Sequence, residues 1–288
     1  MDPPTSLFDS SLDGEVKDGA LDPVYLHVRD DEDCVDDRAY LDQIWNCFGI
    51  ECRDRHFATE FRLLGKFQAR AWELRLGWAL RDLGFAFRWG GHGPDFSVSA
   101  EKPFHIEAVA PAATEALTSN YEVARNWATT VPVNEIVLRY TGSIFSKLDT
   151  YSRYVARGMI RATDPYVIAL SGANIPQASL SGSPFPWVLL PLFAIGQKER
   201  RTSTGGRVSC DIFLESGQRQ LSALIFAPHH IKNRPEHSGR PPGDDFLVVH
   251  NPHATNPLPR GTISRGREWA ATETMPEMVA DWRSSKAP

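Results

Sequence analysis

The longest amphipathic pattern of the chain lies between Ala58 and Leu83. Large apolar residues recur there at mixed intervals of three and four, and no proline interrupts them. This period is typical of a helix that buries one face. Gly84 follows directly, and glycine is the residue that most often ends a helix. The pattern therefore predicts one helix over residues 58 to 83.

Short apolar or alternating runs elsewhere predict strands. We expect strands at residues 24–28, 85–89, 95–98, 104–110, 135–140, 165–170, 221–227 and 246–250. We also expect a turn from Gly90 to Pro94, a loop or helix through residue 130, a helix from about Ser143 to Arg157, a buried segment at 187–195 and a turn at 203–206. Helices mixed with short strands favour an α/β or α+β fold, and we predict α/β: a central mixed β-sheet flanked by helices.

The two ends of the chain differ from its middle. Residues 1–22 are rich in Pro, Ser, Asp and Gly, which predicts a flexible acidic tail or loosely attached arm. No linker-like stretch divides residues 23–288, so we expect them to form a single domain. No apolar run approaches the roughly 20 residues that cross a bilayer, and the N-terminus does not resemble a signal peptide. We therefore expect a cytoplasmic protein without a membrane partner.

Charge is distributed unevenly along the sequence. The formal net charge is −5, yet the first 54 residues hold 15 Asp and Glu against 4 Lys and Arg, and the remaining residues hold 21 against 27. The body after residue 54 is therefore mildly basic, which permits contacts with nucleic-acid phosphates. Ordinary solvated surface charge explains the same numbers equally well.

The cysteines and the acidic run near the N-terminus carry no recognisable metal motif. The four cysteines are Cys34, Cys47, Cys52 and Cys210, with no CxxC pair and no histidine at zinc-finger spacing. We expect reduced, mostly buried side chains, and the pattern indicates neither a disulfide scaffold nor a structural zinc. The acidic run from Asp30 to Asp37 lacks the glycine and distal glutamate of a calcium loop, so we interpret it as a solvated loop.

Two carboxylates lie on neighbouring strand patterns. Along the run from residue 104 to 110, Glu107 alternates with Ile106 and Ala108, whose face is apolar and is expected to meet the core. Glu107 then lies on the face that can look toward Asp95. Two close carboxylates repel unless a cation lies between them, and Mg²⁺ prefers one or two carboxylates plus water and phosphate. The competing interpretation is that Asp95 makes a turn and Glu107 a surface ion pair.

Glu73 is a third candidate acid. It projects from a partly apolar face of the predicted helix, where an unpaired carboxylate is costly. Its partner is either a metal ion, directly or through water, or a nearby arginine such as Arg70. The sequence leaves both options open.

Three segments in this order resemble the restriction-endonuclease-like superfamily, whose pattern is written PD-(D/E)xK, and an uncharacterised bacterial branch of it. They are Trp72-Glu73-Leu74, Gly93-Pro94-Asp95-Phe96 and Ile106-Glu107-Ala108-Val109. The resemblance implies a core over about residues 58–171, followed by a β-rich extension over 172–288. It also implies a phosphodiesterase that depends on Mg²⁺ or Mn²⁺ and acts on nucleic acid, more on DNA than on RNA. The implied metal-binding positions are Asp95, Glu107, Ala108 and Glu73.

Val109 departs from that pattern, because the superfamily ordinarily places a lysine there. Lys147 is the best substitute. It lies at the margin of an apolar helical stripe near Ile144 and Tyr151, where a lysine buries its stem and directs its ammonium group toward the sheet edge. An ordinary surface lysine is the alternative interpretation, and Arg139 is a second cationic candidate.

Other motifs give weaker signals. We interpret His229, His230, His250 and His253 as loop and turn residues, with a role for His250 left open. No GxSxG elbow, P-loop or dinucleotide-binding GxGxxG is present. Two functions remain. One is a metal-dependent nuclease using Glu73, Asp95, Glu107 and Lys147; the other is a catalytically inactive nuclease-fold protein that binds nucleic acid or a partner protein. A homodimer is left open.

Overall fold

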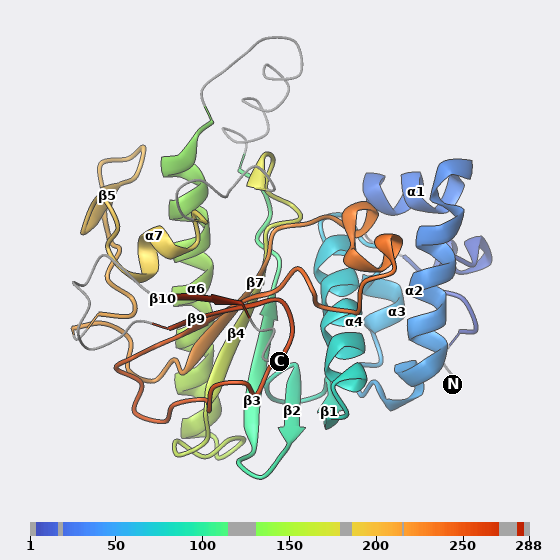
Figure 1. The fold of residues 1–288 in the computed structure, drawn as a ribbon. Helices are drawn as coiled ribbons and strands as arrows, with labels where there is room; N and C mark the ends of the chain where they lie inside the picture. Colours follow the sequence, from blue (N-terminus) through green and yellow to red (C-terminus); the bar gives the residue numbers. More distant parts are fainter. Residues whose placement is uncertain are drawn as a thin grey trace.

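A mixed β-sheet with helices on both faces forms the centre of the molecule (Figure 1). The structure, a computed structural model, describes residues 4–16, 20–114, 131–178, 186–214, 216–270 and 281–284. The sheet has eight strands in the order β1-β2-β3-β4-β7-β8-β9-β10, and β5 and β6 form a separate hairpin. The predicted α/β class, a mixed sheet flanked by helices, is therefore confirmed.

The strands of the sheet pair in both directions. Pairs β3–β4, β4–β7 and β8–β9 are parallel, and the other neighbours are antiparallel. The strands span β1 Ala86–Trp89, β2 Phe96–Ser99, β3 Phe104–Val109, β4 Tyr166–Ser171, β5 Glu199–Arg201, β6 Arg207–Ser209, β7 Ala223–Ala227, β8 Leu247–His250, β9 Arg267–Ala270 and β10 Asp281–Ser284.

The helices divide between the two faces of the sheet (Figure 1). Helix α6 lies on one side, and α4 lies on the other with α1, α2 and α3 beyond it. The α-helices span α1 Pro23–Asp30, α2 Val35–Phe48, α3 Phe57–Glu60, α4 Phe67–Asp82, α6 Val133–Ala156 and α7 Leu189–Leu192. Short 3₁₀ turns are η1 Ser10–Glu15, η2 Glu32–Cys34, η3 Gly49–Glu51, η5 Ile231–Asn233 and η6 Pro235–Ser238. None of the described helices combines the length and apolar character that crossing a bilayer requires.

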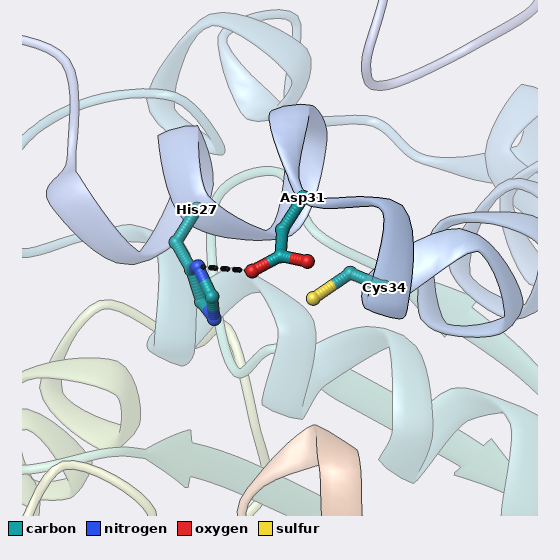
Figure 2. Close-up of side chains that lie close together, drawn as sticks. All are labelled: His27, Asp31 and Cys34. Carbon is teal, nitrogen blue, oxygen red and sulfur yellow. Dashed lines mark ion pairs between the residues drawn. The ribbon is translucent and has the colours of Figure 1, made fainter.

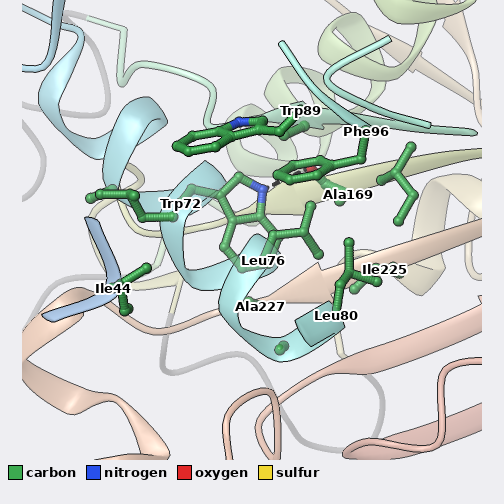
Figure 3. Packing of buried hydrophobic residues seen from close by; sticks show 14 of the residues in the cluster. Ile44, Trp72, Leu76, Leu80, Trp89, Phe96, Ala169, Ile225 and Ala227 are labelled. Atoms are coloured by element: carbon green, nitrogen blue, oxygen red, sulfur yellow. Dashed lines mark hydrogen bonds between the residues drawn. The ribbon is translucent and has the colours of Figure 1, made fainter. Parts of the chain in front are cut away.

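Two hydrophobic cores lie on opposite faces of the sheet. The first joins the sheet to α4 and the N-terminal helices, and Figure 3 shows Trp72, Leu76 and Phe96 within it. The Trp72 indole N–H donates to the Ala169 carbonyl oxygen of β4 at 2.9 Å, which fixes α4 on the sheet. The second core joins the other face to α6 and α7. Since both faces are covered, strands such as β4 are buried along their whole length.

The strand alternation of β3 follows the sequence pattern. Ile106 and Ala108 lie in the first core as predicted, and Val109 packs on the second. The opposite face is buried as well, so His105 and Glu107 are enclosed polar residues. Each must therefore have a hydrogen-bonding or ionic partner.

The single helix predicted over residues 58–83 is wrong in its first third. The structure has the short helix α3 and then α4, and Gly65 between them takes a φ of +75°. That left-handed conformation suits glycine and cannot continue an α-helix. Gly84, at φ +81°, ends α4 as predicted.

Two predicted strands are helical. Residues 24–28 belong to α1, where Asp22 accepts the Val24 N–H at 2.8 Å and Pro23 occupies the first turn. Residues 135–140 form the start of α6, which continues through the predicted helix at 143–157. Their apolar, β-branched residues favour a strand locally, but the buried positions of the element follow a helical period: Ile136, Val137, Tyr140, Thr141, Ile144, Leu148 and Tyr151.

Other predictions have mixed outcomes. The strands predicted at 85–89, 95–98, 104–110, 165–170, 221–227 and 246–250 are confirmed as β1, β2, β3, β4, β7 and β8. The buried segment at 187–195 contains α7, and the turn at 203–206 joins β5 to β6. Strands β9 and β10 were not predicted. The segment expected to run through residue 130 lies mostly outside the described residues.

The N-terminal segment is packed where the structure describes it. Leu7 is fully buried, and the Phe8 ring stacks on Tyr25 in the first core. The Leu7 N–H donates to Asp42 of α2 at 2.8 Å. The loosely attached arm expected from composition is therefore a wrong description of residues 7 and 8. The acidic run from Asp30 to Asp37, expected to be a solvated loop, is the junction between α1, η2 and α2.

Candidate active site

Asp95 and Glu107 meet at one end of the β2–β3 pair. Asp95 directly precedes β2, and its backbone carbonyl accepts the Gly90 N–H at 2.9 Å, which closes the turn after β1. Its Oδ2 accepts the Ala108 backbone N–H at 2.8 Å. Glu107 lies in β3, and its side chain is 4% exposed. The hairpin therefore places both carboxylates next to each other in a buried setting.

The register of β2 and β3 explains how Ala108 can contribute. Phe96 pairs with Ile106, and the same register continued past the start of β2 would set Pro94 opposite Ala108. Proline has no N–H and cannot donate to the Ala108 carbonyl as an ordinary strand residue would. The Ala108 carbonyl points to the same side of β3 as its N–H, which already bonds Asp95. The Ala108 carbonyl oxygen therefore lies on the side of β3 on which Asp95 binds the Ala108 N–H.

Helix α6 supplies the groups that contact Glu107. The Lys147 Nζ lies 2.8 Å from Glu107 Oε1, and the Tyr154 hydroxyl donates to Glu107 Oε2 at 3.4 Å. The Tyr166 hydroxyl of β4 donates to the Lys147 carbonyl at 3.2 Å, which holds this part of α6 on the sheet. Lys147 therefore does not point to open solvent; its side chain is 25% exposed.

Tyr154 was not identified from the sequence. It lies seven residues after Lys147, and residues seven apart share one face of a helix, so this spacing was the signal that could have found it. Arg139, the second cationic candidate, lies two turns before Lys147 and in α6 instead of a strand. Its Nε donates to the Ala112 carbonyl at 2.6 Å and does not reach Glu107.

Glu73 joins the site from the opposite face of the sheet. Both of its carboxylate oxygens lie 3.1 Å from Arg70 on the same helix, so the arginine that the sequence offered as one option does contact Glu73. Arg70 also binds Asp54 at 2.7 Å and Glu60 at 2.5 Å. A single guanidinium therefore serves three carboxylates.

Buried negative charge dominates the electrostatics. Burial and the Asp95 charge raise the pKa of Glu107 to about 7 and that of Glu73 to about 8, although Lys147 and Arg70 act in the opposite direction. Burial also raises the pKa of Asp95. Burial opposes the charged form of Lys147, but Glu107 and Asp95 outweigh it and raise its pKa. The site thus holds more carboxylate than its two cations neutralise.

The donor set suits a hard divalent cation. Asp95, Glu107 and the Ala108 carbonyl offer oxygen atoms, which Mg²⁺ and Mn²⁺ prefer, and the raised carboxyl pKa values mean that added positive charge would stabilise the ionised forms. Among the described residues, one group of three His, Cys, Asp or Glu side chains has its donor atoms within 4.8 Å of one another. That group consists of His27, Asp31 and Cys34 and lies outside this site. The donor atoms of Asp95, Glu107 and Glu73 therefore do not all lie within 4.8 Å of one another, and Glu73 interacts with Asp95 electrostatically.

Two of the histidines considered from the sequence contact other residues. His250 ends β8 and contacts Glu268 Oε1 at 2.6 Å, and His230 contacts the Gln68 amide at 2.5 Å. Each therefore has a partner other than Asp95 and Glu107.

Comparisons with protein-family models, with curated proteins and with solved structures gave no match. The functional argument therefore rests on the geometry of the residues.

Proposed function

We propose that this chain is a Mg²⁺- or Mn²⁺-dependent nuclease that hydrolyses phosphodiester bonds, with DNA rather than RNA as its substrate. The arrangement resembles the PD-(D/E)xK site of the restriction-endonuclease-like superfamily with its lysine displaced. The observation that carries the proposal is the 2.8 Å contact between Lys147 Nζ and Glu107 Oε1.

This contact supports the displaced lysine for a geometric reason. A lysine at position 109 would extend from the same face of β3 as Glu107, because residues two apart share a face. Val109 packs there on the core formed with α6. Lys147 approaches the same face from α6. Its ammonium group therefore lies beside Glu107, although β3 itself has no lysine.

The residues divide the chemistry between them. A bound ion would polarise the scissile phosphate and lower the pKa of water. Asp95, Glu107 and the Ala108 carbonyl would hold the ion. The raised pKa of Lys147 keeps it protonated at neutral pH, so it stabilises negative charge that develops on the phosphate and does not accept a proton. Tyr154 holds Glu107 in place from the other carboxylate oxygen.

A second function is favoured by one observation. Both oxygens of Glu107 already have donors, Lys147 and Tyr154, so the carboxylate is satisfied without an ion. A catalytically inactive nuclease-fold protein, which binds nucleic acid or a partner protein, would have the same contacts. That protein would show binding without metal-dependent cleavage.

Cleavage assays separate the two functions. The purified chain is incubated with linear and supercoiled DNA and with RNA, in Mg²⁺, in Mn²⁺ and in EDTA. The nuclease proposal expects cleavage that EDTA abolishes and that Asp95→Asn reduces by roughly 1000-fold or more. Asp149→Asn, which changes an exposed carboxylate of α6, is the matched control and should cut like the wild type. Metal-independent binding with no cleavage by the wild type supports the inactive alternative instead.

A further inference from the structure

A second group of metal-ligand side chains lies at the junction of α1 and η2. Figure 2 shows His27, Asp31 and Cys34 turned toward one another. The His27 Nδ1 lies 3.2 Å from Asp31 Oδ2, and one donor atom from each of the three side chains lies within 4.8 Å of the others. This group contains nitrogen and sulfur, so it does not bear on the Mg²⁺ or Mn²⁺ site at Asp95.

Local structure brings the three residues together. His27 and Asp31 are one helical turn apart at the end of α1. Asp31 also caps η2, where its Oδ1 accepts the Asp33 N–H at 2.9 Å, and η2 ends at the buried Cys34. The sequence did not indicate this group because His27 and Cys34 are seven positions apart, which is no zinc-finger spacing.

A cation from a distant part of the chain already lies beside this group. The Lys232 Nζ of η5 is 2.9 Å from His27 Nε2, while Nδ1 of the same ring faces Asp31. A positive charge therefore stands next to the three donors, and it comes from outside the segment that holds them.

We propose that His27, Asp31 and Cys34 form a zinc(II) site and that zinc takes the place of the Lys232 ammonium group. Zinc accepts nitrogen, sulfur and carboxylate oxygen together, and three protein ligands leave its fourth position to water. On binding, the Cys34 thiol releases one proton to solvent, and Lys232 leaves the group as a protonated ammonium ion. The exchange replaces one cation by another, so no unpaired buried charge results.

The exchange also changes a contact between distant parts of the chain. Lys232 belongs to η5, and its contact with His27 joins α1 to the C-terminal extension. A zinc ion would link α1 to η2 instead. Zinc binding would therefore remove the contact of Lys232 with His27, while the buried ion pair of Arg234 with Asp37 remains.

Cobalt(II) titration of the full chain tests the proposal, because a thiolate ligand gives cobalt a charge-transfer absorption that oxygen ligands do not. The wild type should show this absorption, and one equivalent of zinc should remove it. Cys34→Ser should abolish it. His27→Gln and Asp31→Asn change partly exposed side chains that are expected to leave folding intact, and each should weaken binding by roughly 10- to 100-fold or more. Cys47→Ser, at an exposed cysteine, is the matched control and should behave like the wild type.

Lys232→Met tests the exchange itself. Removal of the competing ammonium group should tighten zinc binding by about tenfold. Weaker binding in this variant would show that Lys232 assists the site and would overturn the exchange. No thiolate absorption in the wild type, or absorption that persists in Cys34→Ser, would overturn the zinc site. Asp95→Asn should keep the absorption, which separates this result from the fate of the nuclease proposal.

Discussion

Two carboxylate–cation pairs flank Asp95 from opposite faces of the sheet, and they are built differently. On the α4 side, Arg70 binds Glu73 and also Asp54 and Glu60. On the α6 side, Lys147 contacts a single carboxylate, Glu107. The Lys147 side chain is 25% exposed and that of Arg70 is 15% exposed. Arg70 thus pairs with three carboxylates, whereas Lys147 pairs with one and is more exposed, which is the arrangement that the proposed contact with a substrate requires.

This difference indicates that the α4 side and the α6 side of the sheet have different roles. The α4 side holds the Glu73 carboxyl next to Asp95 through a shared guanidinium, and burial and the Asp95 charge raise the pKa of Glu73 to about 8. Under the proposed nuclease function, the α6 side would supply the groups that contact the phosphate. We therefore expect variants on the α6 side to lower activity more than stability, and variants on the α4 side to do the reverse.

The largest expected effect separates the two glutamates. Glu107→Gln removes a carboxylate proposed as a metal ligand and should lower the single-turnover cleavage rate by roughly 1000-fold. Glu73→Gln removes an ionisable carboxyl near Asp95 and should lower the rate by about tenfold, since its oxygens do not lie within 4.8 Å of those of both Asp95 and Glu107. Equal losses in the two variants would contradict the different roles of the two sides.

Stability should show the opposite order for the two cations. Arg70→Met leaves three carboxylates without their shared partner and should cost about 3–5 kcal/mol of unfolding free energy. Lys147→Met leaves Glu107 with its Tyr154 contact, and solvent screens the partly exposed pair, so we expect a cost of about 1 kcal/mol. Urea denaturation in EDTA measures both. A larger loss for Lys147→Met would reverse the assignment of roles.

A smaller effect is expected at Tyr154. Tyr154→Phe removes the hydroxyl that donates to Glu107 Oε2 and should lower the cleavage rate by about tenfold, with little change in stability. Tyr151→Phe is the matched control on the same helix, because its ring packs on Tyr166 while the Glu107 contact belongs to Tyr154. Similar rates for the two variants would remove Tyr154 from the site.

A further effect concerns pH. The pKa of Glu107 rises from 4.5 to about 7 on folding, so the folded state holds this proton more tightly than the unfolded state. Its contribution to stability is full below pH 4.5 and is lost as the pH rises through about 7. In EDTA, the wild type should lose urea resistance relative to Glu107→Gln between about pH 5 and 8, and Mg²⁺ or Mn²⁺ should reduce that loss. Parallel pH profiles would contradict the raised pKa.

The sequence predicted most of the fold that carries the site. Residues 85–110 follow the pattern of turns and alternating strands closely because glycine and proline mark their ends. The strand predicted at residues 135–140 was wrong because their β-branched composition favours a strand locally. Packing along the whole length of α6 instead determines its helical conformation and its buried face. The covering of both sheet faces, which buries Glu107, is a tertiary property that no local pattern contains.

The sequence could predict the residues of the candidate site, but not all of the ion pairs that they make. Asp95, Glu107 and Lys147 stood out by spacing and helical position, and the structure brings them together. The three carboxylates that share Arg70 could not be anticipated, because Asp54 and Glu60 come from a segment whose path depends on the break at Gly65. Position along a helix indicates which face a residue occupies, but not which loop packs against that face.

One measurement tests the central claim, that Lys147 supplies the cation missing at Val109. The single-turnover rate of DNA cleavage in Mn²⁺ is compared among the wild type, Lys147→Met and Arg139→Met. Arg139 lies on the same helix and donates to a backbone carbonyl away from Glu107, so it is the matched control. We predict a fall of roughly 100-fold or more for Lys147→Met and a wild-type rate for Arg139→Met. Cleavage by Lys147→Met at the wild-type rate would contradict the account.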